Sequence, residues 1–167
     1  MSQTFDNIEF RNVCGQFLTG VTVVTAKGEK EELVGFTANS FASVSLDPPL
    51  VLVCPDKKLG SYPAFMKAEG FAIHILGHEQ EELSTQFAKR GVDKFNGIDH
   101  KEGLYGAPIL PETLAVLQCR TVNKVDGGDH TILIGQVESI GKCEKERNPL
   151  GFFRGQYTRV EDRVVKA

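Results

Sequence analysis

A strong hairpin signal in the second half of the chain constrains the fold more than any other feature of the sequence. The segments 114–124 and 131–140 both have the pattern of β-strands, and Asp126-Gly127-Gly128-Asp129 lies between them. Glycine in a short turn adopts the backbone angles that join two antiparallel strands tightly. The sequence therefore predicts an antiparallel pair here, and any fold of the chain must contain it.

Five further segments have the character of strands. The β-branched run 21–26 and the segment 33–36 flank a charged turn, which predicts a second hairpin. The continuous apolar run 50–54 indicates a strand buried on both faces, 71–76 alternates, and 152–160 predicts a last strand. Hairpin connectivity without strand-helix alternation predicts a mainly β fold, a closed antiparallel β-barrel with peripheral helices. A length of 167 residues predicts a single domain over residues 1–167.

Three segments predict helices around this barrel. The first begins at Asp6 or Asn7 and ends at Gly20, and the other two cover 61–70 and 79–90. The third carries Leu83 and Phe87 on one face. The segment 91–111 is rich in glycine and predicts a long loop. The first helix has apolar residues at helical spacing, namely Phe10, Val13, Cys14, Phe17 and Leu18.

The stretch 35–49 is unusual because it places polar side chains between two apolar runs. Such residues can offer side-chain and backbone donors to an anion. They can equally satisfy the backbone of a polar bend and bind nothing, and the residue types alone leave both interpretations open. The polar residues are Thr37, Asn39, Ser40, Ser43 and Ser45.

This stretch also resembles the signature of a known family, the short-chain flavin reductases. The resemblance implies the FMN-binding split-barrel fold and an NAD(P)H-dependent enzyme that transfers hydride to FMN or FAD. It further implies that reduced flavin passes to a partner monooxygenase and that the protein is a homodimer. The matching residues, in order, are Thr37-Ala38-Asn39-Ser40-Phe41, Ser43-Val44-Ser45-Leu46-Asp47-Pro48-Pro49-Leu50-Val51, Phe87-Ala88, Asp93-Lys94-Phe95, Gly128-Asp129-His130, Ile134-Gly135-Gln136-Val137 and Pro149-Leu150-Gly151-Phe152-Phe153-Arg154-Gly155-Gln156-Tyr157.

The resemblance implies that flavin lies along the polar stretch. Backbone amides from Gly35 to Ser40 would face the ring edge, and the side chains of Thr37, Asn39 and Ser40 would serve the ribityl chain and phosphate. Tyr157 is an aromatic residue in the last strand, and we expect it at a subunit interface as well. The implied flavin-binding positions are Gly35, Phe36, Thr37, Ala38, Asn39, Ser40, Cys54, Pro55, Ser61, Phe87, Lys94, Phe95, His130 and Tyr157.

The chemistry of individual side chains adds to these expectations. Ser61 near a helix start and Lys94 on a loop are suited to bind phosphate. His130 follows the hairpin turn, where an imidazole could donate to a nicotinamide carboxamide or to the flavin edge, so we predict it as the catalytic residue. The family has a polar, often Asn-containing stretch after the core strand, whereas this chain has Asp56, and Lys57 or Lys58 could take over its phosphate contacts.

Charge and cysteine usage exclude several other classes of function. The net charge is −3 and the basic residues are scattered, so we expect no nucleic-acid partner. No apolar run approaches the ~20 residues of a membrane span, and we expect no membrane association. The cysteines lie far apart and no histidine stands at ligand spacing, which predicts no metal site, reduced thiols and a cytoplasmic location. They are Cys14, Cys54, Cys119 and Cys143.

Two rival functions remain open at this point. One is a flavin-binding electron carrier, and the other is an oxidase of the pyridoxamine-phosphate split-barrel type. The sequence also leaves open the choice between FMN and FAD and between NADH and NADPH, since it contains no dinucleotide-binding glycine motif to examine.

Overall fold

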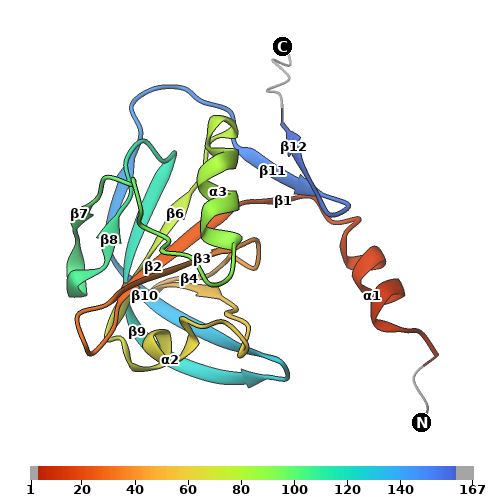
Figure 1. Ribbon diagram of the computed structural model, residues 1–167, viewed down its shortest axis with the longest axis horizontal. Coiled ribbons are helices and arrows are strands. Elements are labelled where there is room, and N and C mark those ends of the chain that lie inside the picture. Colours follow the sequence, from red (N-terminus) through yellow and green to blue (C-terminus); the bar gives the residue numbers. More distant parts are fainter. Residues whose placement is uncertain (1–3, 161–167) are drawn as a thin grey trace.

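The computed structural model describes residues 4–160, most of which lie in or around one antiparallel sheet (Figure 1). The sheet has seven strands in the order β3-β2-β6-β9-β10-β5-β4, and each neighbouring pair is antiparallel. The predicted mainly β, antiparallel class is therefore confirmed. Since β3 and β4 are the two ends of this order, closure of the barrel stays a prediction. The predicted domain, 1–167, includes residues outside the described range. The strands of the sheet are β2 Thr22–Lys27, β3 Leu33–Ala38, β4 Ala42–Leu46, β5 Pro49–Val53, β6 Gly70–Ile75, β9 Ala115–Gly127 and β10 His130–Lys142.

Both predicted hairpins are present. Strands β9 and β10 are joined by Gly128 and Asp129, and Gly128 has a φ of +78°, which glycine adopts without steric cost. The strands run further than predicted, because pairing continues to Gly127 opposite His130 at one end and Ala115 opposite Lys142 at the other. The second hairpin pairs β2 with β3 from Lys27 opposite Leu33 to Thr22 opposite Ala38.

The polar stretch 35–49 is a bend only in part, which corrects the sequence-based interpretation. Strand β3 continues through Thr37 and Ala38, a turn follows, and Ser43 and Ser45 lie on β4. Strand β4 pairs only with β5 and forms an edge of the sheet. Its polar side chains can therefore alternate on an exposed strand, a setting that the residue types did not distinguish from a turn.

Two other strand predictions need correction. The run 50–54 is only half buried, because Val51 and Val53 face the core while Leu50 and Leu52 are partly exposed. The predicted last strand is two strands, β11 Leu150–Phe153 and β12 Gln156–Arg159. They pair with each other and reverse at Arg154 and Gly155, which both have positive φ. Strand β11 also pairs with the short β1, Thr19–Gly20, and the three strands form a separate sheet. The remaining strands, β7 Lys101–Glu102 and β8 Pro108–Ile109, interrupt the predicted long loop.

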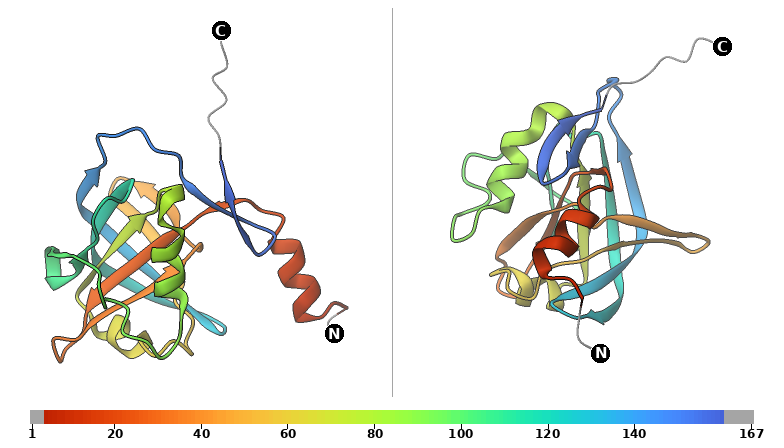
Figure 2. Two further views of the ribbon diagram at one scale, coloured as in Figure 1. Left: turned by 45° about the horizontal axis from the view of Figure 1, so that its top comes forward. Right: turned by 90° about the vertical axis from the view of Figure 1, so that its right-hand side faces the viewer.

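The helices are shorter than predicted. Helix α1, Asn7–Cys14, begins with a capping box at Asp6 and Glu9 and ends well before Gly20. It has no buried residue and projects from the sheet (Figure 2). Helix α2, Tyr62–Lys67, has Pro63 in its first turn, and α3, Glu81–Ala88, follows a 3-10 turn at His78–Gln80. A second 3-10 turn covers Leu104–Gly106. No helix in the described part of the chain is long and apolar enough to span a membrane.

The core divides into two clusters on either side of β2. One contains Phe36, Val53, Phe71 and Leu133 and packs the strands of the sheet together with Phe65 of α2. The other contains Val23, Leu76, Phe87 and Leu150, and it joins α3 and the β11–β12 hairpin to the sheet. The second cluster thereby fixes α3 next to β3, where most of the predicted site residues lie.

Candidate functional site

Hydrogen bonds tie the end of β3 to α3 and to the last hairpin. Thr37 Oγ1 donates to the Ser84 carbonyl oxygen at 2.6 Å. The Ser84 hydroxyl is in turn 2.7 Å from the Tyr157 hydroxyl on β12. The hydroxyl hydrogen of Thr37 is therefore already used within the protein, and only its oxygen is left to accept a hydrogen bond from a ligand.

Gly35 allows α3 to pack closely on β3. A Cβ at this position would lie 2.5 Å from Cε1 of Phe87, and Phe87 is only 1% exposed. Phe87 also packs edge to face with Phe95, with ring centroids 5.2 Å apart. Phe87 and Phe95, which were both predicted to bind flavin, therefore pack against each other, and Phe87 also lines a cavity.

A cleft of about 500 Å³ opens between β3, the loop before α2 and the segment after α3. We call it the basic cleft. It combines apolar side chains with an excess of positive charge, which suits a ligand that has a flat ring and a phosphate group. Five predicted residues line it, Gly35, Phe36, Ser61, Phe87 and Lys94. Its charged lining residues are Lys58, Lys89, Arg90, Lys94 and Asp93.

Hydrogen bonds to the backbone of Lys94 and its neighbour hold this lysine at the edge of the basic cleft. The side-chain amide of Gln86 on α3 donates to the Lys94 carbonyl oxygen at 2.9 Å and to the Asn96 carbonyl oxygen at 3.0 Å. Lys94 is half-buried, and burial lowers the pKa of its ammonium group from the ordinary value. Phosphate oxygens would offset part of the cost of this burial, so the position suits an anionic ligand.

A second, smaller pocket of about 200 Å³ lies at the end of β3. Thr37, Ala38, Asn39 and Tyr157 line it together with Phe152. The structure therefore brings the middle of the predicted polar stretch together with the predicted aromatic residue of the last hairpin. Tyr157 is partly buried here against its own chain and packs edge to face with Phe152, at 5.7 Å between ring centroids.

Ser40, Cys54 and Pro55 connect the ends of β3 and β5. The Cys54 backbone N–H donates to Ser40 Oγ at 3.0 Å, which leaves the Ser40 hydroxyl hydrogen available to a ligand. Burial raises the pKa of the Cys54 thiol from its ordinary value. Pro55 is buried, and its carbonyl oxygen accepts from the Thr131 backbone N–H at 3.1 Å.

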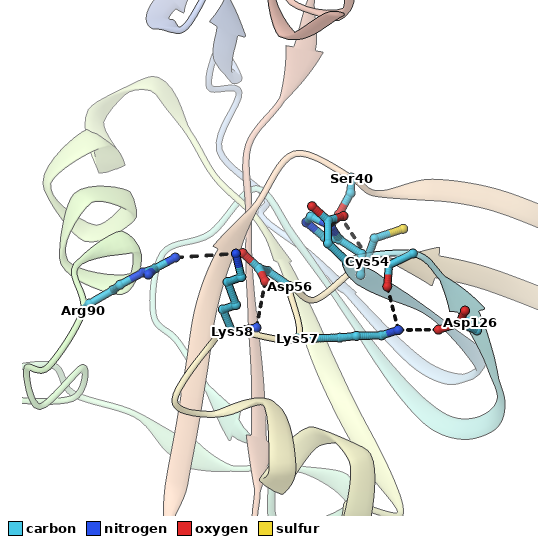
Figure 3. Close-up of polar contacts among 10 residues, drawn as sticks. Ser40, Cys54, Asp56, Lys57, Lys58, Arg90 and Asp126 are labelled. Carbon is cyan, nitrogen blue, oxygen red and sulfur yellow. Dashed lines mark hydrogen bonds and ion pairs between the residues drawn. The ribbon is translucent and has the colours of Figure 1, made fainter. Parts of the chain in front are cut away.

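The segment after β5 separates the roles of its two lysines (Figure 3). The side chain of Lys57 turns toward the β9–β10 hairpin, where it bonds the Asp126 carboxylate and the Gly128 carbonyl oxygen. Lys58 lines the basic cleft instead. Asp56 accepts a hydrogen bond from the Lys58 backbone N–H at 2.7 Å and lies 3.9 Å from the Arg90 guanidinium, so its carboxylate is partly neutralised. Of the two lysines, Lys58 is therefore the one placed to meet a phosphate.

His130 lies beside this segment and outside the residues that line the two cavities. It forms an isolated β-bridge with Asp56, and its Nδ1–H donates to the Asp129 carboxylate at 2.7 Å. This hydrogen bond lowers the pKa of Asp129. The Nε2 atom of a neutral ring with this hydrogen bond can only accept, so a partner at Nε2 must be a donor.

Sequence reasoning missed Lys89 and Arg90, which contribute two of the four positive charges of the basic cleft. The signal was present, because these residues follow Phe87-Ala88 directly and precede Gly91. A larger cavity of about 740 Å³ lies along residues 142–148 and contains no predicted site residue. Within residues 4–160, no group of three or more His, Cys, Asp or Glu side chains could hold a metal ion.

The fold and the basic cleft together define an antiparallel β-protein with a cationic, partly apolar cleft beside β3. Residues 14–161 match the flavin reductase like domain. The chain is 46% identical over 150 residues to an FMN reductase (NADH) from Agrobacterium fabrum, covering 90% of this chain and 84% of that protein. It is 43% identical over 167 residues to the reductase subunit of a flavin-dependent monooxygenase from Rhodococcus jostii, covering 99% and 85% of the two chains.

A solved structure agrees with these sequence relatives. The NADH:FAD oxidoreductase of Streptomyces globisporus, in complex with NAD and FAD fragments, superposes with a TM-score of 0.89 at 37% identity, and 98% of each chain is covered. The chain therefore belongs to the flavin reductase like family, and the prediction of that family from the sequence is confirmed.

Proposed function

We propose that this protein is an NAD(P)H-dependent flavin reductase that transfers hydride to FMN or FAD and supplies the reduced flavin to a partner monooxygenase. The observation that carries the proposal is the basic cleft beside β3, which lies within the matched region and has four cationic side chains over an apolar lining. A flavin nucleotide has both features that this lining favours, an aromatic ring system and a phosphate.

The reaction requires little acid-base catalysis by the side chains of the protein. Hydride leaves the reduced nicotinamide and is accepted by the flavin, which supplies the electron sink, and a proton from solvent completes the reduction. The chain must therefore bind both ring systems next to each other and let the reduced flavin leave. This agrees with the shortage of acidic side chains in the basic cleft, where Asp93 is the single one.

The proposed binding roles of the individual residues follow from the contacts already described. Ser61, Lys94 and Lys58 bind the flavin phosphate at the basic cleft, with Lys89 and Arg90 adding to the local positive potential. Asn39 and Ser40 serve the ribityl chain with their free donors, and the backbone from Gly35 to Ala38 borders the ring. His130 binds the nicotinamide, whose carboxamide N–H can donate to Nε2.

The decisive experiment is anaerobic oxidation of NADH and NADPH in the presence of free FMN, FAD or riboflavin, followed at the nicotinamide absorption band. Many turnovers per enzyme are expected, with no third substrate added, because the flavin is itself the acceptor. Reduction that stops after one equivalent of bound flavin would favour an electron carrier. Failure to oxidise NAD(P)H, together with oxygen consumption when pyridoxamine phosphate is supplied in air, would favour the oxidase.

The proposal extends to the assembly and location of the protein. We infer a homodimer, since every residue of α1 is at least partly exposed and the helix carries several apolar side chains. We also infer that the curved sheet closes as a split barrel, because the hydrogen bond between Ser40 and Cys54 joins the ends of β3 and β5. A cytoplasmic location is consistent with the four cysteines, which are all free thiols.

A further inference from the structure

Packing contributes little to the position of the turn that joins β9 and β10, although Thr131 beside it is buried. Strand β5 pairs with β10 only from Leu133 to Gln136, so the hairpin runs on for several residues past the end of this neighbour. The residues from Val122 to Asp129 are all exposed. His130 therefore lies on a part of the sheet whose position must depend on polar contacts.

The segment after β5 provides those contacts. Pro55 accepts from the Thr131 N–H at 3.1 Å, Asp56 bridges His130, and the Lys57 N–H donates to the Asp129 carbonyl oxygen at 3.0 Å. These backbone contacts all lie on the β10 side of the turn, or at Asp129 within it. Helix α2 adds two more contacts, because the Tyr62 hydroxyl lies 2.7 Å from Thr131 Oγ1 and Lys124 Nζ donates to the Met66 carbonyl oxygen at 2.5 Å. None of these contacts reaches Asp126 or Gly128.

The side chain of Lys57 holds the other side of the turn. Its ammonium group bonds the Asp126 carboxylate, on the β9 side, and the Gly128 carbonyl oxygen at 2.6 Å, within the loop (Figure 3). The backbone and the side chain of Lys57 both contact the loop, at Asp129 and Gly128. Lys57 thus clamps the residues that immediately precede His130 from two directions.

We propose that Lys57 is a positioning residue for nicotinamide binding, which fixes the hairpin so that His130 presents Nε2 to the cofactor. This inference rests on the proposed function and on the role given there to His130. An exposed ion pair such as Lys57 with Asp126 contributes little to the stability of a fold, because both groups stay hydrated. Its effect is therefore expected in the geometry of binding and not in the melting temperature.

The test compares Lys57→Met, Lys57→Arg and His130→Ala, alone and with Lys57→Met and His130→Ala combined. NADH KM and kcat are measured at saturating FMN, with the melting temperature as the control for folding. His130→Ala is expected to raise the NADH KM roughly three- to tenfold, and Lys57→Met roughly two- to fivefold. Both should leave kcat within about twofold, and Lys57→Arg should restore most of the lost affinity because it keeps the charge and donors.

The combined variant identifies the route of the effect. If Lys57 acts through His130, Lys57→Met adds nothing to the NADH KM of His130→Ala. A matched control is Lys67→Met on α2. Lys67 forms an exposed ion pair with Glu29, so this variant makes the same charge change and should leave the NADH KM unchanged.

The outcomes that overturn the inference differ from those that overturn the function. Turnover by the wild type with an unchanged NADH KM in Lys57→Met, or an equal effect of Lys57→Met with and without His130, would overturn the inference and leave the reductase intact. An unchanged NADH KM in His130→Ala would remove both the role of His130 and the inference. Absence of catalytic flavin reduction by the wild type would overturn the proposed function itself.

Discussion

At the scale of single residues, histidine has two opposite uses in this chain. His130 is partly exposed and has one ring nitrogen free, whereas His74 on β6 is fully buried with both nitrogens occupied. The His74 Nδ1–H donates to the Val23 carbonyl oxygen at 3.0 Å, and Nε2 accepts from the Leu110 N–H at 3.1 Å. Only the neutral ring fits these two partners, so His74 joins β2 and β6 to the residue that follows β8.

This arrangement predicts that acid destabilises the protein through His74. Burial lowers the pKa of His74 to about 4 in the folded chain, against 6.5 for an ordinary histidine. Below pH 6.5 the unfolded chain takes up a proton that the folded chain does not, so the free energy of unfolding falls from pH 6.5 to about 4 and levels off below. The difference in pKa corresponds to about 3 kcal/mol.

The measurement is urea denaturation at several pH values between 4 and 7, on the wild type and on His74→Asn, which keeps one side-chain donor and does not titrate. The slope of unfolding free energy against pH should be smaller in this variant. His100→Asn is the matched control, because His100 is exposed. Equal slopes in His74→Asn and the wild type would mean that His74 does not cause the loss.

A second residue-scale prediction concerns Lys94. Lys94→Ala should weaken binding of FMN several-fold and leave riboflavin almost unaffected, because only FMN has the phosphate that we assign to this lysine. The loss for FMN should shrink as salt is raised, since screening reduces the wild type's advantage. Flavin titrations followed by fluorescence at two ionic strengths test this. An equal loss for riboflavin and FMN would rule out phosphate recognition by Lys94.

At the scale of elements, the contact between β3 and α3 decides the shape of the site. The sequence predicted both elements and the residues Gly35 and Phe87, but it could not predict that they touch. Contacts between residues far apart in sequence depend on the arrangement of the whole sheet, and no local pattern encodes them. The same reason explains why the sequence identified Lys94 but did not find Lys89 and Arg90, which reach the basic cleft only because α3 lies across β3.

The other errors in predicting helices and strands arise where the same residues fit two kinds of local structure. Serine is common in turns and is also compatible with exposed edge strands, so the residue types of Ser43 and Ser45 did not reveal β4. The turn at Arg154 and Gly155 divides the last predicted strand, although its glycine could have indicated it. By contrast, the β9–β10 hairpin was predictable because its glycine turn and two long strand patterns agree.

The contact itself gives an element-scale prediction. Gly35→Ala would place a methyl group 2.5 Å from the Phe87 ring, so Phe87 and α3 must move outward. Such overpacking costs about 1 to 3 kcal/mol in stability and should also weaken flavin binding, since the basic cleft lies between the same elements. Thermal unfolding and flavin titration measure the two effects. Gly20→Ala is the control, because a Cβ there meets nothing within 4 Å, and an equally small effect at both positions would contradict the packing argument.

At the scale of the whole molecule, α1 is the feature that the rest of the chain does not explain. Its last turn is attached to the body through the Gly15 carbonyl oxygen, which accepts from the Arg154 N–H at 2.9 Å, and through Gln16, which bonds the Arg154 side chain. A helix of eight residues has little stability alone in water. Ile8 and Val13 are nevertheless 69% and 70% exposed, which suggests a partner surface.

We expect that surface to belong to a second copy of the chain. Sedimentation equilibrium of the wild type at micromolar concentration should give twice the mass of the chain, and Val13→Glu should shift the equilibrium toward the monomer by burying a charge at the contact. Leu104→Glu is the control, because Leu104 is exposed and follows β7 closely in the sequence, and β7 lies at the opposite end of the molecule from α1 (Figure 1). A wild type that sediments as a monomer would contradict the proposed homodimer.

The partly buried thiol of Cys54 has a consequence for how long such an enzyme stays active in air. Reduced flavin that escapes its acceptor reacts with oxygen and yields hydrogen peroxide, which attacks thiolates and not thiols. Cys54 lies at the end of β5, hydrogen-bonded through its backbone to Ser40, and burial keeps its pKa above the ordinary value. The cysteine next to the proposed flavin site therefore presents less thiolate to this oxidant than an exposed cysteine would.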